Sequence, residues 1–284
     1  MKILLKELRE RTGAGFGDCK KALEECNNDI EKAISYLRVL GIAKANKKID
    51  RVATSGLIAM HIEENSGVLV ELNCETDFVA RNDRFKHLIL DLASLACKER
   101  CTKAEDLKNF KYGNVGTVHE AIVNEISVLG EKLELSRVCY LEAKNGVVFG
   151  YAHGSTTNLG TIGALVLLES HGDKVKLRDI GKQIGMHIVA MKPTALSIEN
   201  LDQKELLNER FIIEEQVKRL DKSAEVKKKI IDGRISKYYE DTVLLEQKFF
   251  RDEKMKIIDF INSKELVLGC PIKLADYKLF SIGN

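Results

Sequence analysis

The chain has 284 residues, of which 44% are hydrophobic and 31% charged, as in soluble globular proteins of two or three domains. Its 45 basic and 43 acidic residues leave a net charge of +2, which argues against direct binding to nucleic acid. No apolar run approaches the length of a membrane span, and residues 1–6 are too short and too soon charged for a signal peptide, so no membrane partner is expected.

Residues 1–41 predict a bundle of three short helices. The third helix is expected to begin after Asn28, with Glu31 at the spacing of a capping box, and to stop at Gly41. Three helices in about 40 residues bury a marginal core, so this bundle is expected to function by docking.

The run Gly13-Ala14-Gly15-Phe16-Gly17 invites interpretation as a dinucleotide-binding loop. That interpretation is disfavoured because the run follows a helix instead of a strand and lacks the third glycine at the required offset. A tight turn between helices is the better prediction. Residues 42–55 then form a mildly basic linker.

A strand-to-helix junction follows the hairpin that residues 56–62 and 67–74 predict. Beyond the turn, Asn82 can cap a helix with apolar residues at intervals of three and four. The turn holds an adjacent acid and aromatic residue, Asp77 and Phe78. Either Phe78 is a core residue and Asp77 a helix-initiating carboxylate, or the pair is a probe aimed at a partner; the junction alone leaves both open.

A second unit of similar plan follows a helix that is expected to begin at Thr117 and end at Gly130. Residues 138–143 and 147–151 flank Asn145-Gly146 and predict a hairpin, and the apolar stretch 161–169 predicts a central strand before a helix. Strand, turn and helix recur, which indicates two copies of one α+β subdomain. The core is therefore divided into subdomain N, residues 56–139, and subdomain C, residues 140–199 and 241–284.

Residues 200–240 predict an antiparallel helical hairpin that protrudes as an arm, with Ser223 capping its second helix. Its evenly mixed charge favours a solvated arm over a nucleic-acid-binding stripe. Residues 266–274 and 277–282 are expected to be short closing strands. The predicted fold class is α+β: a bundle, a core of two subdomains with antiparallel sheets, and a helical hairpin.

Known catalytic motifs are missing from the sequence, which has no Gly-x-Ser-x-Gly elbow, Walker loop or His-Glu-x-x-His. Its seven cysteines form an odd set without a Cys-x-x-Cys pair and indicate reduced thiols in a cytoplasmic protein. Cys97 and Cys101 could touch but have no histidine at metal spacing, so neither metal nor cofactor is expected. Among the histidines, His187 is expected to be packed and hydrogen-bonded, whereas His153 is the better functional candidate.

Two long motifs resemble the bacterial elongation factor Ts family. Leu8-Arg9-Glu10-Arg11-Thr12-Gly13-Ala14-Gly15, continued by Asp18-Cys19-Lys20-Lys21-Ala22-Leu23, resembles its opening, and Asn73-Cys74-Glu75-Thr76-Asp77-Phe78-Val79-Ala80 resembles its second signature. Shorter matches follow in the family's order: Tyr151-x-His153-Gly154, Ile162-Gly163, Met186-His187 and Lys192-Pro193. The resemblance implies a ubiquitin-associated-like bundle ahead of the two-subdomain core. It also implies a guanine-nucleotide exchange factor for elongation factor Tu in translation elongation.

The resemblance also implies roles for individual residues. Phe78 would wedge between helices of the GTPase, and Asp77 would perturb the region that holds Mg²⁺ and the phosphates, with Thr76 and Val79 orienting the pair. A second contact on the GTPase would come from Arg11, Thr12, Gly13, Ala14 and Gly15, and a third from His153. Four features depart from the family: a longer loop at 154–160, Lys132 in place of asparagine, no proline in 247–250, and few residues after the last predicted strand, so that a terminal docking helix is not expected.

Two functions of other classes compete with this expectation, although no bond-making or bond-breaking chemistry is predicted. One is a nucleotide-binding enzyme built on the glycine turn. The other is an adaptor of the ubiquitin-associated type in which only residues 1–53 matter. A homodimer is left open.

Overall fold

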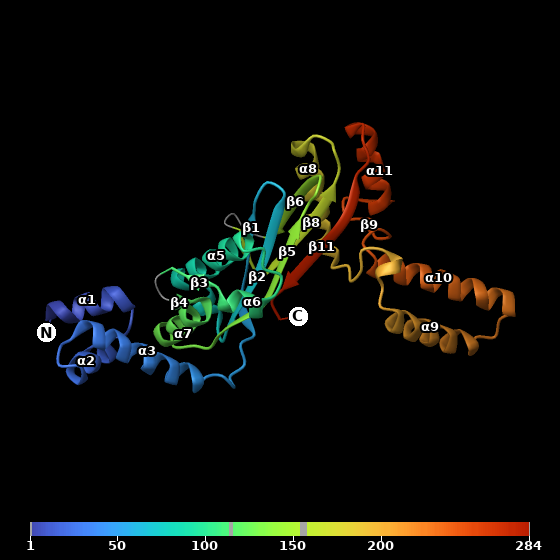
Figure 1. Ribbon diagram of the computed structural model, residues 1–284. Helices are drawn as coiled ribbons and strands as arrows, with labels where there is room; N and C mark the ends of the chain where they lie inside the picture. The colour runs from blue at the N-terminus through green and yellow to red at the C-terminus, as the bar shows by residue number, and fades with distance from the viewer. Residues whose placement is uncertain (1, 114–115, 154–157, 284) are drawn as a thin grey trace.

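The computed structural model describes residues 2–113, 116–153 and 158–283. Gly154 and the first part of the predicted 154–160 loop lie outside the described residues. Figure 1 shows an elongated molecule with a helical bundle at one end, a mixed core in the middle and a two-helix arm at the other end. The predicted α+β class is confirmed. No helix within the described ranges has the length and apolar character needed to cross a membrane.

The N-terminal bundle consists of α1 (Lys2–Thr12), α2 (Phe16–Glu25) and α3 (Ile30–Asn46). Two details of α3 differ from the prediction. Asp29 and not Asn28 caps it, because the Asp29 carboxylate accepts a 3.1 Å hydrogen bond from the Lys32 amide. The helix also continues past Gly41, which is buried where a Cβ would lie 3.5 Å from the Cβ of Ser127. Gly41 therefore permits close packing of α3 on the core and does not terminate the helix.

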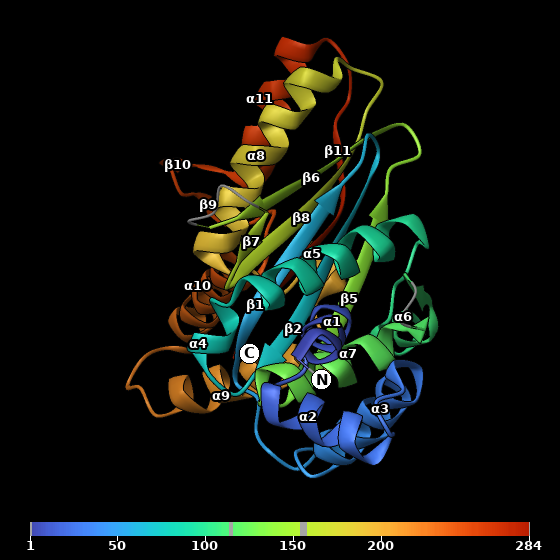
Figure 2. The ribbon, with the colours of Figure 1, turned by 90° about the vertical axis from the view of Figure 1, so that its left-hand side faces the viewer.

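The first sheet of the core is antiparallel in the order β5-β2-β1-β7. Its strands are β1 (Ser55–Ile62), β2 (Ser66–Cys74), β5 (Leu133–Glu142) and β7 (Leu159–Gly160). The predicted hairpin of β1 and β2 is confirmed. One face is covered by helices (Figure 2), and the helices and short strands between β2 and β5 are α4 (Asp77–Ala80), α5 (Asp83–Lys98), α6 (Ala104–Asn109), β3 (Lys111–Tyr112), β4 (Gly116–Thr117) and α7 (Val118–Leu129).

Helix α7 begins and ends as its sequence predicts. Thr117 and Glu120 form a reciprocal capping box at its start. Gly130 ends it with a φ of 80°, a left-handed conformation that glycine adopts without strain. The residues directly after Gly130 thereby turn back toward β2, which matters for the site described below.

The second sheet is antiparallel in the order β11-β8-β6 and confirms the central position predicted for residues 161–169. It consists of β6 (Gly146–Ala152), β8 (Ile162–Glu169) and β11 (Lys273–Ser281). Its outer face is covered by α8 (Lys174–Met191) and α11 (Ile257–Leu268), with the ribbon β9 (Lys248–Phe249) and β10 (Asp252–Lys256) beside them. In both sheets the first strand pairs with a central second strand, and the third strand closes the other side.

The predicted hairpin around Asn145-Gly146 is wrong. Strand β5 pairs with β2 of the first sheet, and β6 pairs with β8 of the second, so the turn carries the chain from one sheet to the other. The Glu169 carboxylate accepts hydrogen bonds from the Lys144 and Asn145 amides. Turn residues determine only that the chain reverses locally. The partner of each strand depends on which strand it hydrogen-bonds to and which apolar core its side chains join.

The inner faces of the two sheets pack on each other through a shared apolar cluster. Ile58, Met60 and Leu69 of the first sheet meet Val148 and Leu165 of the second. The core therefore has four layers, helices, sheet, sheet and helices, and the shared cluster holds the two sheets against each other.

The strand predicted at 266–274 is also wrong over most of its length, because β11 begins only at Lys273. Residues 266–268 belong to α11, which Gly269 ends with a φ of 76°. Leu266 and Val267 lie on the exposed side of this helix.

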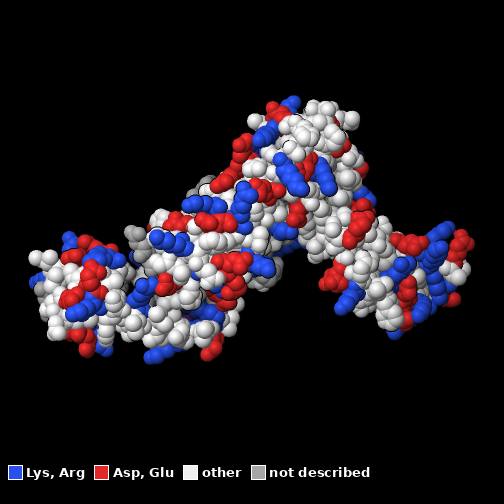
Figure 3. Space-filling view, viewed as in Figure 1, with Lys and Arg blue, Asp and Glu red and all other residues white. Residues whose placement is uncertain are grey.

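The arm consists of α9 (Gln203–Lys218) and α10 (Ala224–Thr242), preceded by a short 3-10 turn, Ile198–Asn200. Asp202 and Ser223 cap the two helices, as predicted for Ser223. Within the arm helices only Ile213 and Val217 are buried. Acidic and basic side chains alternate over its surface (Figure 3), in keeping with a solvated, protruding element.

Candidate partner-binding site

The junction between β2 and α5 presents Phe78 to solvent. The residue lies in α4, a single helical turn, and is 80% exposed. The next two residues, Val79 and Ala80, are buried in the core beneath α5. The short helix α4 is therefore packed in the core through Val79 and Ala80, whereas the ring of Phe78 points outward. The alternative that placed Phe78 in the core is wrong.

Asp77 is also exposed and pairs with a neighbour on the same short helix. Its Oδ2 lies 2.9 Å from Nη2 of Arg81, and both side chains are more than half exposed. Thr76 is the N-cap residue, and its side chain makes no capping bond. An exposed ion pair contributes about 0–1 kcal/mol to stability, so Asp77 adds little to folding.

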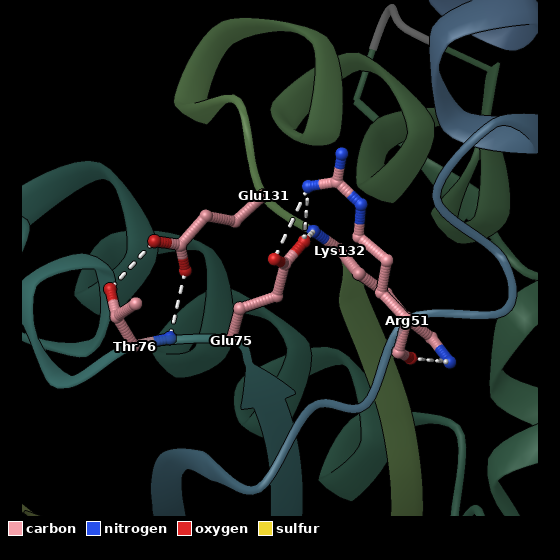
Figure 4. Close-up of polar contacts among 5 residues, drawn as sticks. All are labelled: Arg51, Glu75, Thr76, Glu131 and Lys132. Carbon is pink, nitrogen blue, oxygen red and sulfur yellow. Dashed lines mark hydrogen bonds and ion pairs between the residues drawn. The ribbon is translucent and has the colours of Figure 1, made fainter.

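The backbone just before Asp77 and Phe78 is hydrogen-bonded to the turn that follows α7 (Figure 4). Both donors of Thr76 bond to the Glu131 carboxylate: the amide at 2.9 Å and the hydroxyl at 2.6 Å. The Glu75 carboxylate accepts a 2.7 Å bond from the Lys132 amide and further bonds from Arg51. We call this network of Arg51, Glu75, Thr76, Glu131 and Lys132 the junction clamp.

The electrostatics of the junction clamp agree with its geometry. The hydrogen bond from the Lys132 amide, followed by that from Arg51, lowers the pKa of Glu75, so its carboxylate stays charged. Beside it, burial and the charge of Glu131 raise the pKa of Cys74 to about 12. The Cys74 thiol donates to the Thr76 carbonyl at 3.1 Å and remains a neutral structural group.

A groove of about 560 Å³ runs beside Asp77. Its lining combines the basic and polar side chains of Arg81 and of α5, including Lys86 and His87, with apolar residues that include Leu159 of β7 and Ile282, which follows β11. The exposed ring of Phe78, on the residue after Asp77, and the groove beside Asp77 are both features suited to contact with a folded partner.

The turn of Gly13 to Gly15 in the bundle lies against α5, the helix that follows Asp77 and Phe78. A Cβ on Gly13 would lie 2.8 Å from Nη1 of Arg84, a residue in the first turn of α5. Arg84 in turn forms two hydrogen bonds with the Glu125 carboxylate, at 2.6 and 3.0 Å. The φ of Gly13 is 68°, a left-handed conformation that favours glycine at this position.

The other predicted residues of that turn have mainly local partners. The Thr12 hydroxyl donates to the Leu8 carbonyl, Ala14 is buried in the bundle, and Arg11 pairs with Glu31 at 2.7 Å. Arg11 and Gly15 remain exposed. The turn follows helix α1 as expected, which is the arrangement that disfavours a dinucleotide loop.

His153 lies on the other subdomain, directly after β6. It is exposed, and its Nδ1 is 3.3 Å from the Tyr151 hydroxyl. His153 does not line the groove beside Asp77, and within the described residues its ring contacts Tyr151.

His187 is a packed core residue, as predicted. Its Nε2 lies 3.0 Å from Oε1 of Gln247, and its Nδ1 accepts a bond from the Phe250 amide. Burial lowers the pKa of His187 to about 4, so the imidazole is neutral at pH 7.

Sequence reasoning missed the junction clamp and the contact between Gly13 and Arg84. More than 50 positions separate Thr76 from Glu131, Glu75 from Lys132 and Gly13 from Arg84, and 24 separate Arg51 from Glu75, so no local pattern marks these contacts. The only signal was that Glu131 and Lys132 follow a predicted helix stop at Gly130. A metal-donor cluster, His61, Glu63 and Cys97, was missed as well and lies at the other end of β2.

Comparison with known proteins gives a consistent result. Residues 75–284 match the family described as Elongation factor TS. A protein named Elongation factor Ts from Wolbachia sp. subsp. Brugia malayi (strain TRS) is 64% identical over 280 residues, 99% of this chain and 98% of that protein. Its namesake from Wolbachia pipientis wMel is 63% identical over 280 residues, 99% of this chain and 97% of that protein. That from Ehrlichia canis (strain Jake) is 49% identical over 281 residues, with 99% and 98% covered.

Proposed function

The chain belongs to the elongation factor Ts family, and we propose that it is a guanine-nucleotide exchange factor that binds elongation factor Tu and promotes GDP release in translation elongation. The observation that carries this proposal is the 80% exposure of Phe78 on a turn anchored at both ends. A large aromatic side chain left in water on a rigid mount is suited to fill a pocket in a partner.

Exchange of this kind requires coupling of binding energies and no bond chemistry. A factor that binds the nucleotide-free GTPase better than the GDP form must, by reciprocity, have its own binding weakened by GDP to the same extent. A 10⁴-fold shift corresponds to about 5.5 kcal/mol. One well-buried aromatic anchor supplies about 2–4 kcal/mol, so Phe78 can provide a large part of that coupling.

Asp77 is placed to act on the charges around the nucleotide. Its carboxylate is exposed, and its partner Arg81 is exposed too, so the pair can open at little cost when a partner docks. A carboxylate brought near a Mg²⁺-diphosphate group repels the phosphates and competes for the cation that offsets their charge. We assign Asp77 to that role and Phe78 to the wedge.

The junction clamp and the buried Val79 fix the direction of the probe. Thr76 is held by two hydrogen bonds to Glu131, and Val79 is packed in the core. A mount that is already ordered loses less conformational entropy on binding than a mobile loop. The proposed second contact, through the turn of Arg11 to Gly15, and the third, through His153, would add affinity and orientation.

The test is release of fluorescently labelled GDP from purified elongation factor Tu, followed in stopped flow with and without the full-length chain. We expect the chain to accelerate release in proportion to its concentration until the GTPase is saturated. Unchanged release at saturating, folded protein would overturn the proposal.

Two further measurements separate the competing functions. The nucleotide-binding enzyme requires that the chain alone bind GDP or GTP, and we expect calorimetry to show no micromolar binding. The adaptor requires that residues 1–53 retain the binding of elongation factor Tu, and we expect that fragment to bind far more weakly than the full chain.

A further inference from the structure

Three chemically different metal-donor groups converge at the tip of the hairpin formed by β1 and β2. They are the imidazole of His61, the carboxylate of Glu63 and the thiol of Cys97, and their donor atoms lie within 4.8 Å of one another. The Nε2 of His61 is 4.0 Å from Oε1 of Glu63. The cluster joins the end of β1 to the last turn of α5.

The strand period explains why these side chains meet. Leu57 and Ala59 of β1 pack in the core beneath α5, whereas Ile58 and Met60 face the second sheet. Residues 61 and 63 continue the row that faces α5, since alternate residues of a strand share a face. The sequence places an imidazole and a carboxylate there.

Cys97 supplies the third group from the helix. It is the last buried residue of α5, 2% exposed, and its Sγ lies 3.9 Å from the Ser66 hydroxyl. His61 and Glu63 are respectively 38% and 54% exposed in their side chains. The cluster therefore has a fixed buried sulfur and two adjustable donors at the surface.

The separations are close to those of a tetrahedral zinc site. Zinc binds nitrogen and oxygen at about 2.0–2.2 Å and sulfur at about 2.3 Å, which places neighbouring donors about 3.3–3.6 Å apart. The donor atoms lie at most 4.8 Å apart, so side-chain rotations that move the donors of His61 and Glu63 by about 1 Å suffice to reach this geometry. Both side chains have the freedom to make them.

The charges also suit a divalent cation. A zinc–sulfur bond requires the Cys97 thiol to lose its proton. When Zn²⁺ binds, a zinc–sulfur bond forms and that proton passes to solvent. The thiolate and the Glu63 carboxylate then neutralise the charge of the ion, so the half-buried complex carries no net charge.

We propose that His61, Glu63 and Cys97 bind one Zn²⁺ ion, with water in the fourth position, and that the ion fastens the tip of the hairpin to the end of α5. Imidazole and thiolate together favour zinc over Mg²⁺ or Ca²⁺, which prefer oxygen ligands. Strand β2 runs from this tip to Cys74 beside the exchange probe, so the metal site and the probe lie at opposite ends of one strand. The proposed metal site shares no residue with the site proposed for exchange.

The experiment titrates Zn²⁺ into chelator-treated, reduced full-length chain by calorimetry, with Co²⁺ as a spectroscopic substitute. We expect one equivalent of Zn²⁺ to bind and raise the melting temperature, and Co²⁺ to give a thiolate-to-metal charge-transfer band. His61→Ala and Cys97→Ser should each weaken binding at least tenfold, and Cys97→Ser should abolish the band. If Cys97→Ser fails to fold because Cys97 is buried, His61→Ala still tests the proposal, since it changes only a partly exposed side chain.

Cys101→Ser is the matched control, because Cys101 is a buried cysteine shortly after α5 that does not belong to the cluster. It should bind Zn²⁺ like the unmodified chain. The proposal is overturned if the unmodified chain takes up no Zn²⁺, if His61→Ala binds it normally, or if Cys101→Ser loses it as fully as Cys97→Ser does.

Discussion

Replacing Phe78 with alanine distinguishes a probe from a structural residue. Truncation of a core phenylalanine costs about 3–5 kcal/mol of stability. Phe78 is 80% exposed, so about one-fifth of that burial exists, and we expect a loss below about 1 kcal/mol. For a chain of this size such a loss lowers the melting temperature by no more than about 4 °C.

The effect of Phe78→Ala on exchange should be far larger. Truncating an interface anchor costs at least about 2 kcal/mol, which corresponds to roughly a 30-fold loss at 1.4 kcal/mol per tenfold. We therefore expect stimulated GDP release, measured in stopped flow at subsaturating factor, to slow at least tenfold. The matched control is Phe211→Ala, because Phe211 is 61% exposed on the arm and should leave release unchanged.

Two outcomes would refute this reasoning. One is a large drop in the melting temperature of Phe78→Ala together with normal release per folded molecule, which would return the ring to a structural role. The other is an equal loss of release in Phe78→Ala and Phe211→Ala, which would show that any exposed aromatic residue matters.

Three further predictions concern the site and the core. Asp77→Ala should change stability by less than about 1 kcal/mol, since its ion pair is exposed, yet slow GDP release; Asp77→Asn should slow it similarly if charge is the cause. Glu131→Ala leaves both donors of Thr76 unpaired, so it should lower the free energy of unfolding by about 1–3 kcal/mol and slow GDP release. Glu131→Gln has an amide that can pair with both Thr76 groups, so it should retain most of the stability and most of the release rate. The pKa of His187 is about 4 when folded and about 6.5 when unfolded, so the unfolded chain binds the extra proton between these values. The neutral His187 therefore makes its full contribution to the free energy of unfolding above pH 6.5, and that contribution falls by up to about 3 kcal/mol as the pH drops to 4. Over this range the urea midpoint of the unmodified chain should decline more than that of His187→Gln.

Local chemistry predicted much of the fold. Capping of α7 by Thr117 and Glu120, its stop at Gly130 and the cap of α10 by Ser223 all depend on residues within a few positions of one another. The exposure of Phe78 could not be predicted in this way, because an apolar residue at a strand end fits a core and a surface equally well.

Pairing between distant strands marks the limit of that reasoning. Asn145-Gly146 is a strong turn signal, yet the strands on either side find partners in different sheets. Gly146 is needed there because its backbone lies so close to the Leu168 carbonyl of β8 that no side chain would fit. The same limit concealed Glu131 beneath Thr76, since this contact depends on where the end of α7 meets the end of β2.

The packing of the bundle on the core joins the two surfaces proposed to meet elongation factor Tu. Arg84 begins α5, just beyond the turn of Asp77 and Phe78, and its guanidinium lies against Gly13 while pairing with Glu125. A partner that touches both surfaces meets one ordered body, so the second contact forms as an intramolecular step. An aromatic anchor supplies about 2–4 kcal/mol of the roughly 5.5 kcal/mol that a 10⁴-fold shift requires. Under the proposed mechanism Phe78 alone would fall short of that coupling, and we propose that Asp77 and the docked bundle supply the remainder.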